Sequence, residues 1–113
     1  MGYRHTGEEV SNFSAKTNLL KGRNVTVDST GTVVYTTAAT RGLGVLNEDT
    51  LAGEACYIQT TNIDKSTAGG PIVVGTEVEV GTNGKHITLA DGIAIGKALS
   101  TGVTNNEFQL FIY

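Results

Sequence analysis

The chain has 113 residues, a formal net charge of −3 and a hydrophobic fraction of 39% without tryptophan. This length predicts one domain with a modest core, and the acidic balance excludes a typical basic nucleic-acid binder. The single Cys56 excludes an intramolecular disulfide and a zinc site built on cysteines, and no run reaches the roughly 18 apolar residues that a membrane-spanning helix needs.

The first 16 residues are polar and follow neither the helix nor the strand period, so we expect a flexible N-terminal arm over residues 1–16. The remainder, residues 17–113, is expected to fold as a single β domain. Its composition supports this interpretation, because most of the 15 glycines lie there among many valines and threonines, which favours short strands joined by tight turns.

In the first half, strands are predicted at Asn24–Val27 and Thr32–Thr37, with a turn at Asp28–Gly31 between them. A short apolar strand follows at Gly42–Leu46, and the longest strand of this half is expected at Glu54–Asn62.

In the second half, the pair Asn83-Gly84 favours a two-residue hairpin turn, because both central positions of such a turn need positive φ. Five further segments have strand character: Ile72–Val74, Thr76–Val80, Lys85–Leu89, Ile93–Leu99 and Glu107–Tyr113. Short strands at this spacing, with no helical stretch between them, predict an all-β barrel or sandwich.

A shift of 53 residues aligns the sequence with itself. Residues 19–34 then fall on residues 72–87, with four identities among the sixteen positions, all glycine or valine. With a slip of one residue, Leu43-Gly44 matches Ile95-Gly96. Two readings remain open, a duplicated β-unit or the chance self-similarity of a Gly- and Val-rich chain.

If the duplication is real, the repeat units cover about residues 17–60 and 70–113 and are expected to pair around a pseudo-twofold axis. Each unit is too short to bury its apolar face alone. The glycines that the repeat singles out as structural turns are Gly22, Gly31, Gly75 and Gly84.

No catalytic, cofactor-binding or metal-binding set emerges from the polar residues. His5 lies in the arm, and His86 alternates with apolar residues, where a surface or rim position is expected. Most acidic residues fall in predicted turns, where they accept hydrogen bonds from local backbone N–H groups. Glu77 and Glu79 are expected on the solvated face of one strand. We therefore expect a protein that is not an enzyme and uses no cofactor.

Two stretches of the sequence nevertheless point to a family. VTVDSTGTVVYTTA, followed by GLGVLNEDTLAGEACYIQ, resembles the small head-decoration (capsid cement) proteins of tailed bacteriophages. AGGPIVVGTEVEVGTNGK and AIGKALS show the same resemblance, and the segment AGGPIVVGTEV also looks like β-clip modules. The resemblance covers roughly residues 17–113 and rests on the spacing of glycines between the strands, not on catalytic residues.

The resemblance implies a structural virion protein, made in the host cytoplasm, that binds the outer surface of the mature capsid and bridges major capsid subunits. Its partners would be the major capsid protein and two further copies of itself, as a homotrimer at threefold or quasi-threefold sites, with no nucleic acid and no membrane. Family members often contact the capsid through an N-terminal arm, which assigns that role by position alone to Tyr3, Arg4, His5, Val10 and Phe13.

Two other functions remain open. The chain could be a phage fibre or surface adhesion module that binds host glycans by stacking tyrosines on sugars, with Tyr3, Tyr35, Tyr57 and Tyr113 as candidates. It could also be a small trimeric β enzyme acting on carbohydrates or nucleotides, with its site between subunits.

Overall fold

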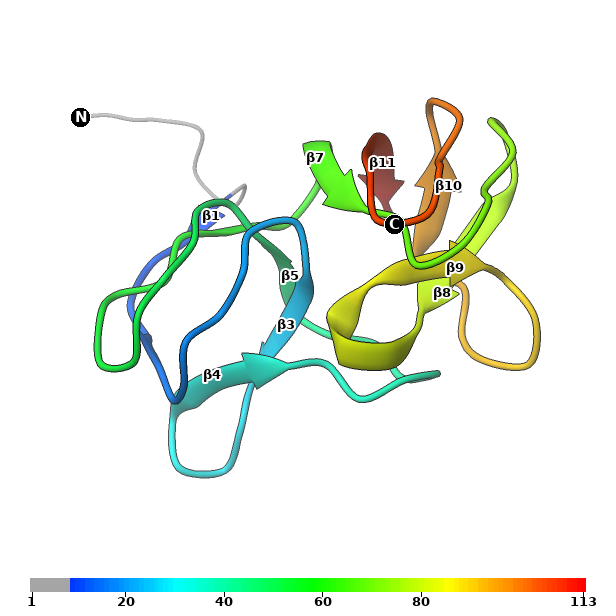
Figure 1. Ribbon diagram of the computed structural model, residues 1–113. Helices are drawn as coiled ribbons and strands as arrows, with labels where there is room; N and C mark the ends of the chain where they lie inside the picture. The colour runs from blue at the N-terminus through cyan, green and yellow to red at the C-terminus, as the bar shows by residue number, and fades with distance from the viewer. Residues whose placement is uncertain (1–8) are drawn as a thin grey trace.

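The computed structural model describes residues 9–113, whose strands form two sheets that follow one another along the chain and lie side by side (Figure 1). The first sheet has the order β1-β6-β5-β3-β4-β2, with β1 (Glu9–Val10), β2 (Ser14–Ala15), β3 (Asn24–Val27), β4 (Thr32–Tyr35), β5 (Gly44–Leu46) and β6 (Ile58–Gln59). The second has the order β7-β11-β10-β8-β9, with β7 (Asn62–Thr67), β8 (Glu77–Val80), β9 (His86–Thr88), β10 (Gly96–Ala98) and β11 (Glu107–Ile112). The predicted all-β fold class is confirmed.

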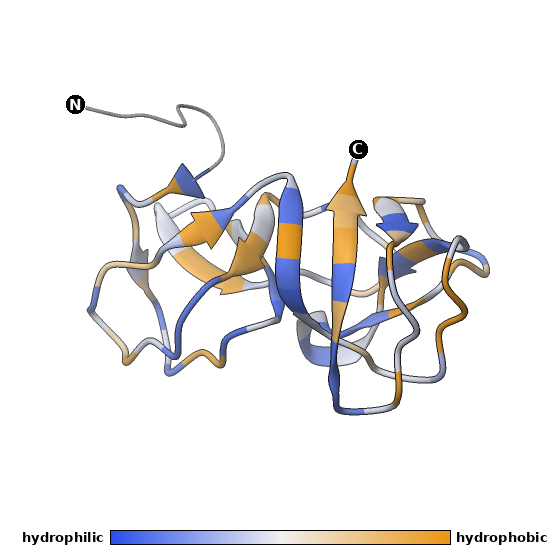
Figure 2. Ribbon diagram, turned by 90° about the horizontal axis from the view of Figure 1, so that it is seen from above, coloured by the Kyte–Doolittle hydropathy of each residue, from blue (hydrophilic) through white to orange (hydrophobic). Residues whose placement is uncertain are grey.

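Each sheet packs its own hydrophobic cluster. The strands alternate between hydrophilic and hydrophobic bands (Figure 2), and in β11 the alternation buries Phe108, Leu110 and Ile112. The first cluster is built around Val25, Val33, Leu46 and Ile58, all from the first half. The second cluster belongs to the second half except for Val45, which comes from the first sheet.

The two sheets repeat one pairing scheme. Val25 pairs with Tyr35 in the first sheet, and Val78 pairs with Thr88 in the second, both displaced by 53 residues. After the slip, the pairs Val45–Gln59 and Leu46–Ile58 recur as Lys97–Phe111 and Ala98–Leu110, displaced by 52 residues. We call two such positions repeat equivalents. The shift that aligns the sequence with itself therefore also aligns the hydrogen-bonded ladders.

The halves are not related by the expected twofold axis. Under a twofold axis, the contact between Asn24 of the first half and His86 of the second would recur between their repeat equivalents, Glu77 and Val33. Val33 is instead buried in the first cluster, and Glu77 is exposed. The contact is head to tail because each half contributes a different surface.

Two expected boundaries also differ from the structure. Residues 9–16 do not lie outside the β domain, because β1 pairs with β6, β2 runs parallel to β4, and Ala15 is buried in the first cluster. These two-residue strands are too short to show a period. Residues 54–62 are not one strand, because the chain leaves the first sheet after β6 and enters the second at β7.

The hairpin prediction is confirmed. The turn between β8 and β9, labelled η1 (Thr82–Gly84), has φ values of +56° at Asn83 and +74° at Gly84, and the Lys85 amide donates to the Thr82 carbonyl at 3.2 Å. This tip points toward the first half (Figure 1), and a side chain at Gly84 would meet the carbonyl oxygen of Asn24 at 2.5 Å.

Candidate functional site

The contact between the two halves, which we call the seam, combines backbone hydrogen bonds with a buried polar group. Four hydrogen bonds to backbone carbonyls cross it. The amide of Thr67 donates to the Gly22 carbonyl at 2.8 Å, and the amide of Ala39 donates to the Val80 carbonyl at 2.8 Å. The Arg23 guanidinium donates to the Asn83 carbonyl at 3.1 Å, and the Arg41 guanidinium donates to the Tyr113 carbonyl.

His86 lies at the centre of the seam, with 0% of its surface exposed. The hydroxyl of Thr36 donates to Asn24 Oδ1 at 2.7 Å, which leaves Asn24 Nδ2 to donate to His86 Nε2 at 3.4 Å. His86 Nδ1 then carries the proton and donates to the Thr67 carbonyl at 3.2 Å. This assignment gives every polar atom of the group a partner.

The expected rim position of His86 is wrong. Burial lowers the pKa of His86 to about 4, against a smaller opposite effect of the hydrogen bond to Thr67. The imidazole is therefore neutral at physiological pH and serves the seam rather than proton transfer. A signal was present in the sequence, because the repeat equivalent of His86 is the buried Val33.

Glu79 is also buried, which corrects the expected solvated position. Its carboxylate accepts hydrogen bonds from the backbone amides of Ala90 and Gly92, so it organises the turn after β9. Glu77 is exposed as expected, and its Oε2 accepts a hydrogen bond of 2.8 Å from the Tyr113 hydroxyl, which raises the pKa of Tyr113. Neither carboxylate faces the other in a catalytic pair.

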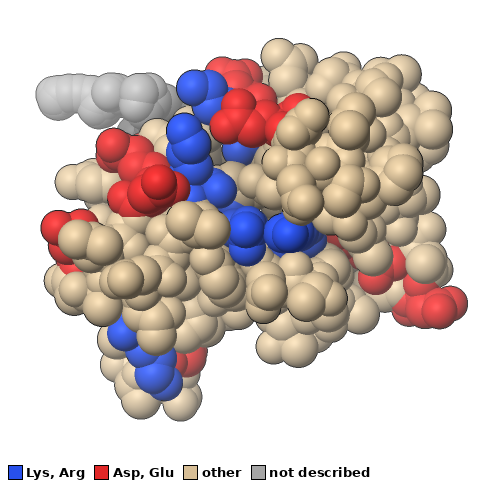
Figure 3. Space-filling view, viewed as in Figure 1, with Lys and Arg blue, Asp and Glu red and all other residues tan. Residues whose placement is uncertain are grey.

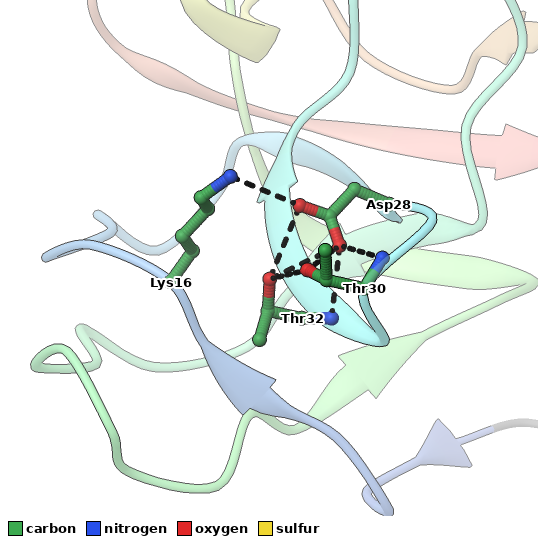
Figure 4. Close-up of polar contacts among 4 residues, drawn as sticks. All are labelled: Lys16, Asp28, Thr30 and Thr32. Carbon is green, nitrogen blue, oxygen red and sulfur yellow. Dashed lines mark hydrogen bonds and ion pairs between the residues drawn. The ribbon is translucent and has the colours of Figure 1, made fainter.

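The turn after β3 is closed by Asp28 (Figure 4). The Thr30 hydroxyl donates to its carboxylate at 2.7 Å and the Thr32 amide at 3.1 Å, and these bonds hold the pKa of Asp28 well below its usual range. Lys16 approaches the same carboxylate at 3.3 Å. Both carboxylate oxygens of Asp28 are thus engaged in holding the turn.

Cationic side chains form a run across one face of the molecule (Figure 3). Lys21 and Lys65 line one small cavity together with Asp64. Arg23 lies over the Tyr35 ring, 5.5 Å from its centroid, and beside Gly84, which Lys85 follows. Among residues 9–113 the one ion pair is Lys16–Asp28, so the side-chain nitrogens of Lys21, Arg23, Lys65 and Lys85 have no carboxylate within 4.0 Å. Two of the four are held by neutral oxygens, because Lys85 donates to Asn105 Oδ1 at 2.8 Å and Arg23 to the Asn83 carbonyl at 3.1 Å.

Two cavities border the seam. They measure about 300 and 290 Å³, the first beside Glu79 and the hairpin tip, the second between Arg41 and Tyr113. Within the described range no three metal-binding side chains converge. Burial raises the pKa of the Cys56 thiol, which packs in the first cluster.

The proposed capsid-contact residues separate into two groups. Tyr3, Arg4 and His5 lie outside the described residues. Val10 and Phe13 are half-buried against the first cluster, so they belong to the folded body. The four turn glycines, Gly22, Gly31, Gly75 and Gly84, have φ values of +82°, +82°, +87° and +74°.

No family model matches the sequence. No curated protein matches it either. Among solved structures, the chain is similar to the N base of the head fibre protein gp8.5 of bacteriophage phi29, with a TM-score of 0.80 and 19% identity over 93% of this chain and 94% of that one. The similarity covers both halves and shows that the fold is shared.

The described part of the chain contains no helix with the length and apolar character needed to cross a membrane.

Proposed function

We propose that this chain is a non-enzymatic structural protein of a phage virion that attaches to the outside of the capsid. The observation that carries the proposal is the fold match to the base of a phage head fibre, which spans almost the whole of both chains. The resemblance of residues 17–113 to head-decoration proteins supports it independently, because it rests on sequence.

Two parts of the chain are candidates for the capsid contact. The first is the segment of residues 1–8, which includes Tyr3, Arg4 and His5. The second is the cationic run, because lysine and arginine side chains without an ion partner favour association with acidic surfaces. Many weak contacts suffice, since a protein that bridges capsid subunits binds in many copies.

The test is co-sedimentation of the purified chain with expanded capsids and with compact precursor shells of the phage that encodes it. We expect binding to expanded capsids and a loss of binding on deletion of residues 1–8, with the thermal unfolding of the body unchanged. Residues 9–16 must be retained, because they contribute β1 and β2. Equal affinity for both shells would contradict state-selective capsid binding.

The contribution of the cationic run is tested by the double substitution Lys21→Glu and Lys65→Glu. We expect weaker capsid binding and a shallower dependence of affinity on salt. Val103→Glu is the control, because it adds a negative charge at a position that is 57% exposed and lies outside the cationic run.

A fibre or adhesion module that binds host glycans is the second candidate. The exposed Tyr57 and Tyr113, and Phe111 stacked edge to face on Tyr113 at 6.5 Å, favour it, because aromatic faces stack on sugars. Binding of the isolated chain to host cell-wall glycans, with none to capsids, would make this the primary function.

A further inference from the structure

We infer that the chain associates head to tail with a second copy of itself, through surfaces equivalent to the two sides of its own seam. The inference comes from comparing repeat equivalents and does not rest on the proposed function.

The seam has two different sides. The first half contributes the row Asn24–Val45–Gln59, whose members lie opposite one another across β3, β5 and β6 and therefore share one face. Asn24 reaches His86, and Val45 packs in the second cluster. The second half contributes Val80, Ile95 and the hairpin tip.

The second side of the seam has an open equivalent in the first half. Val80 and Ile95 are fully buried, whereas their equivalents Val27 and Leu43 are half-buried and 38% exposed. Together with Phe13, Val27 and Leu43 line a groove of about 380 Å³, and Leu43 also borders the seam cavity between Arg41 and Tyr113. The equivalent turns show the same difference. A Cβ built at Gly84 would collide with the Asn24 backbone, whereas a Cβ built at the equivalent Gly31 would meet no atom within 4 Å.

The first side has an open equivalent in the second half. The row Asn24–Val45–Gln59 recurs across β8, β10 and β11 as Glu77–Lys97–Phe111, in the same register. All three are exposed, Phe111 by 43%. This face of the second sheet therefore presents an aromatic surface where the first sheet is covered.

The groove of the first half is equivalent to one side of the seam, and the open sheet face of the second half is equivalent to the other side. The two sides of the seam contact each other within the chain, so the partner that fits both open surfaces is another copy of this chain. A repeated head-to-tail contact closes into a ring when its rotation permits, and a ring leaves neither surface open. In the second half, Lys97 stands where the first half has the buried Val45. The contact between chains is therefore more polar than the seam, and we expect the association to be reversible.

The test is sedimentation velocity of the full chain over a range of concentrations. We expect a discrete oligomer with a mass that is a multiple of 11.8 kDa. Phe111→Glu, on the open sheet face, and Leu43→Glu, in the groove, should each raise the half-association concentration by roughly tenfold or more. Val103→Glu should associate like the unaltered chain, because Val103 is 57% exposed and outside both surfaces.

An equimolar mixture of the two variants decides the geometry. Phe111→Glu retains the groove and Leu43→Glu retains the sheet face, so a head-to-tail contact predicts that the mixture forms species of two chains, which neither variant forms alone. A chain that is monomeric at every concentration overturns the inference. Association of Leu43→Glu that equals that of the unaltered chain also overturns it, because the contact would then be symmetric through the sheet face.

Discussion

At the scale of single residues, His86 couples the seam to pH. Its pKa is about 4 in the folded chain and 6.5 for an unperturbed histidine, so the unfolded chain binds a proton first as the pH falls. The stabilisation is complete above pH 6.5 and is lost progressively toward pH 4. A difference of this size corresponds to about 3 kcal/mol.

We expect the free energy of unfolding, measured by urea titration between pH 4 and pH 7, to fall by an amount of that order as the pH falls. His86→Val lowers stability at pH 7, because Asn24 Nδ2 and the Thr67 carbonyl lose their partner. It should also flatten the pH dependence, and an unchanged slope would show that carboxylates alone cause it.

Ser66 illustrates how the two halves exchange residue volumes. In the first half the large Phe13 lies beside the small Cys56, whose amide donates to the Phe13 carbonyl. In the second half the equivalent of Phe13 is the small Ser66, and the equivalent of Cys56 is the large Phe108, with which Ser66 pairs. The exchange leaves the buried Ser66 hydroxyl without a hydrogen-bond partner.

Removing that hydroxyl should stabilise the fold. We expect Ser66→Ala to raise the free energy of unfolding by about 1 kcal/mol, because the cost of burying an unpaired hydroxyl disappears. Ser100→Ala is the control with the opposite sign, since the Ser100 hydroxyl accepts the Gln109 amide at 2.8 Å. Chemical denaturation of both variants measures the difference, and a destabilised Ser66→Ala would contradict the reasoning.

At the scale of elements, equivalent turns differ in what surrounds them. Gly31 and Gly84 both have positive φ, so alanine at either position costs about 1 kcal/mol of backbone strain. At Gly84 the added Cβ also lies 2.5 Å from the Asn24 carbonyl, within the seam. We expect Gly84→Ala to lower the melting temperature several degrees more than Gly31→Ala, and equal losses would show that the hairpin tip moves away freely.

The sequence predicts elements better than their surroundings. The 53-residue shift and the Asn83-Gly84 turn are local patterns, and both match the pairing of the strands. Burial of Glu79 depends on what covers the outer face of β8, which alternation does not report. His86 shares the inner face with its paired residue Val80, and its burial depends on the first half closing over the seam. The sequence does not predict β1 and β2, because these two-residue strands form only by pairing with the distant strands β6 and β4.

The candidate binding surfaces were even less visible in the sequence. Phe111 alternates with Leu110 and Ile112 as a strand residue should, and its exposure becomes informative only when it is compared with its half-buried equivalent, Gln59. The comparison needs the registers of both sheets. The repeat is visible in the sequence alone. Which surface of each half is exposed follows only from the head-to-tail contact between the halves.

At the scale of the whole molecule, Val45 joins the two halves into one folding unit. It belongs to the first sheet but packs in the second cluster at 1% exposure, while its equivalent Lys97 faces solvent. We expect Val45→Ala to lower the free energy of unfolding by about 2 kcal/mol through the cavity that it leaves. Lys97→Ala should change it by less than about 0.5 kcal/mol.

Two probes test whether the halves unfold together. Reactivity of the Cys56 thiol reports the first cluster, and amide exchange in β10 and β11 reports the second. In the unaltered chain both should respond at one denaturant concentration, because the buried Val45 and His86 couple the two halves across the seam. Val45→Ala should move both transitions together, since it removes a contact that each half needs; two separate midpoints in the unaltered chain would mean that the halves fold independently and merely touch.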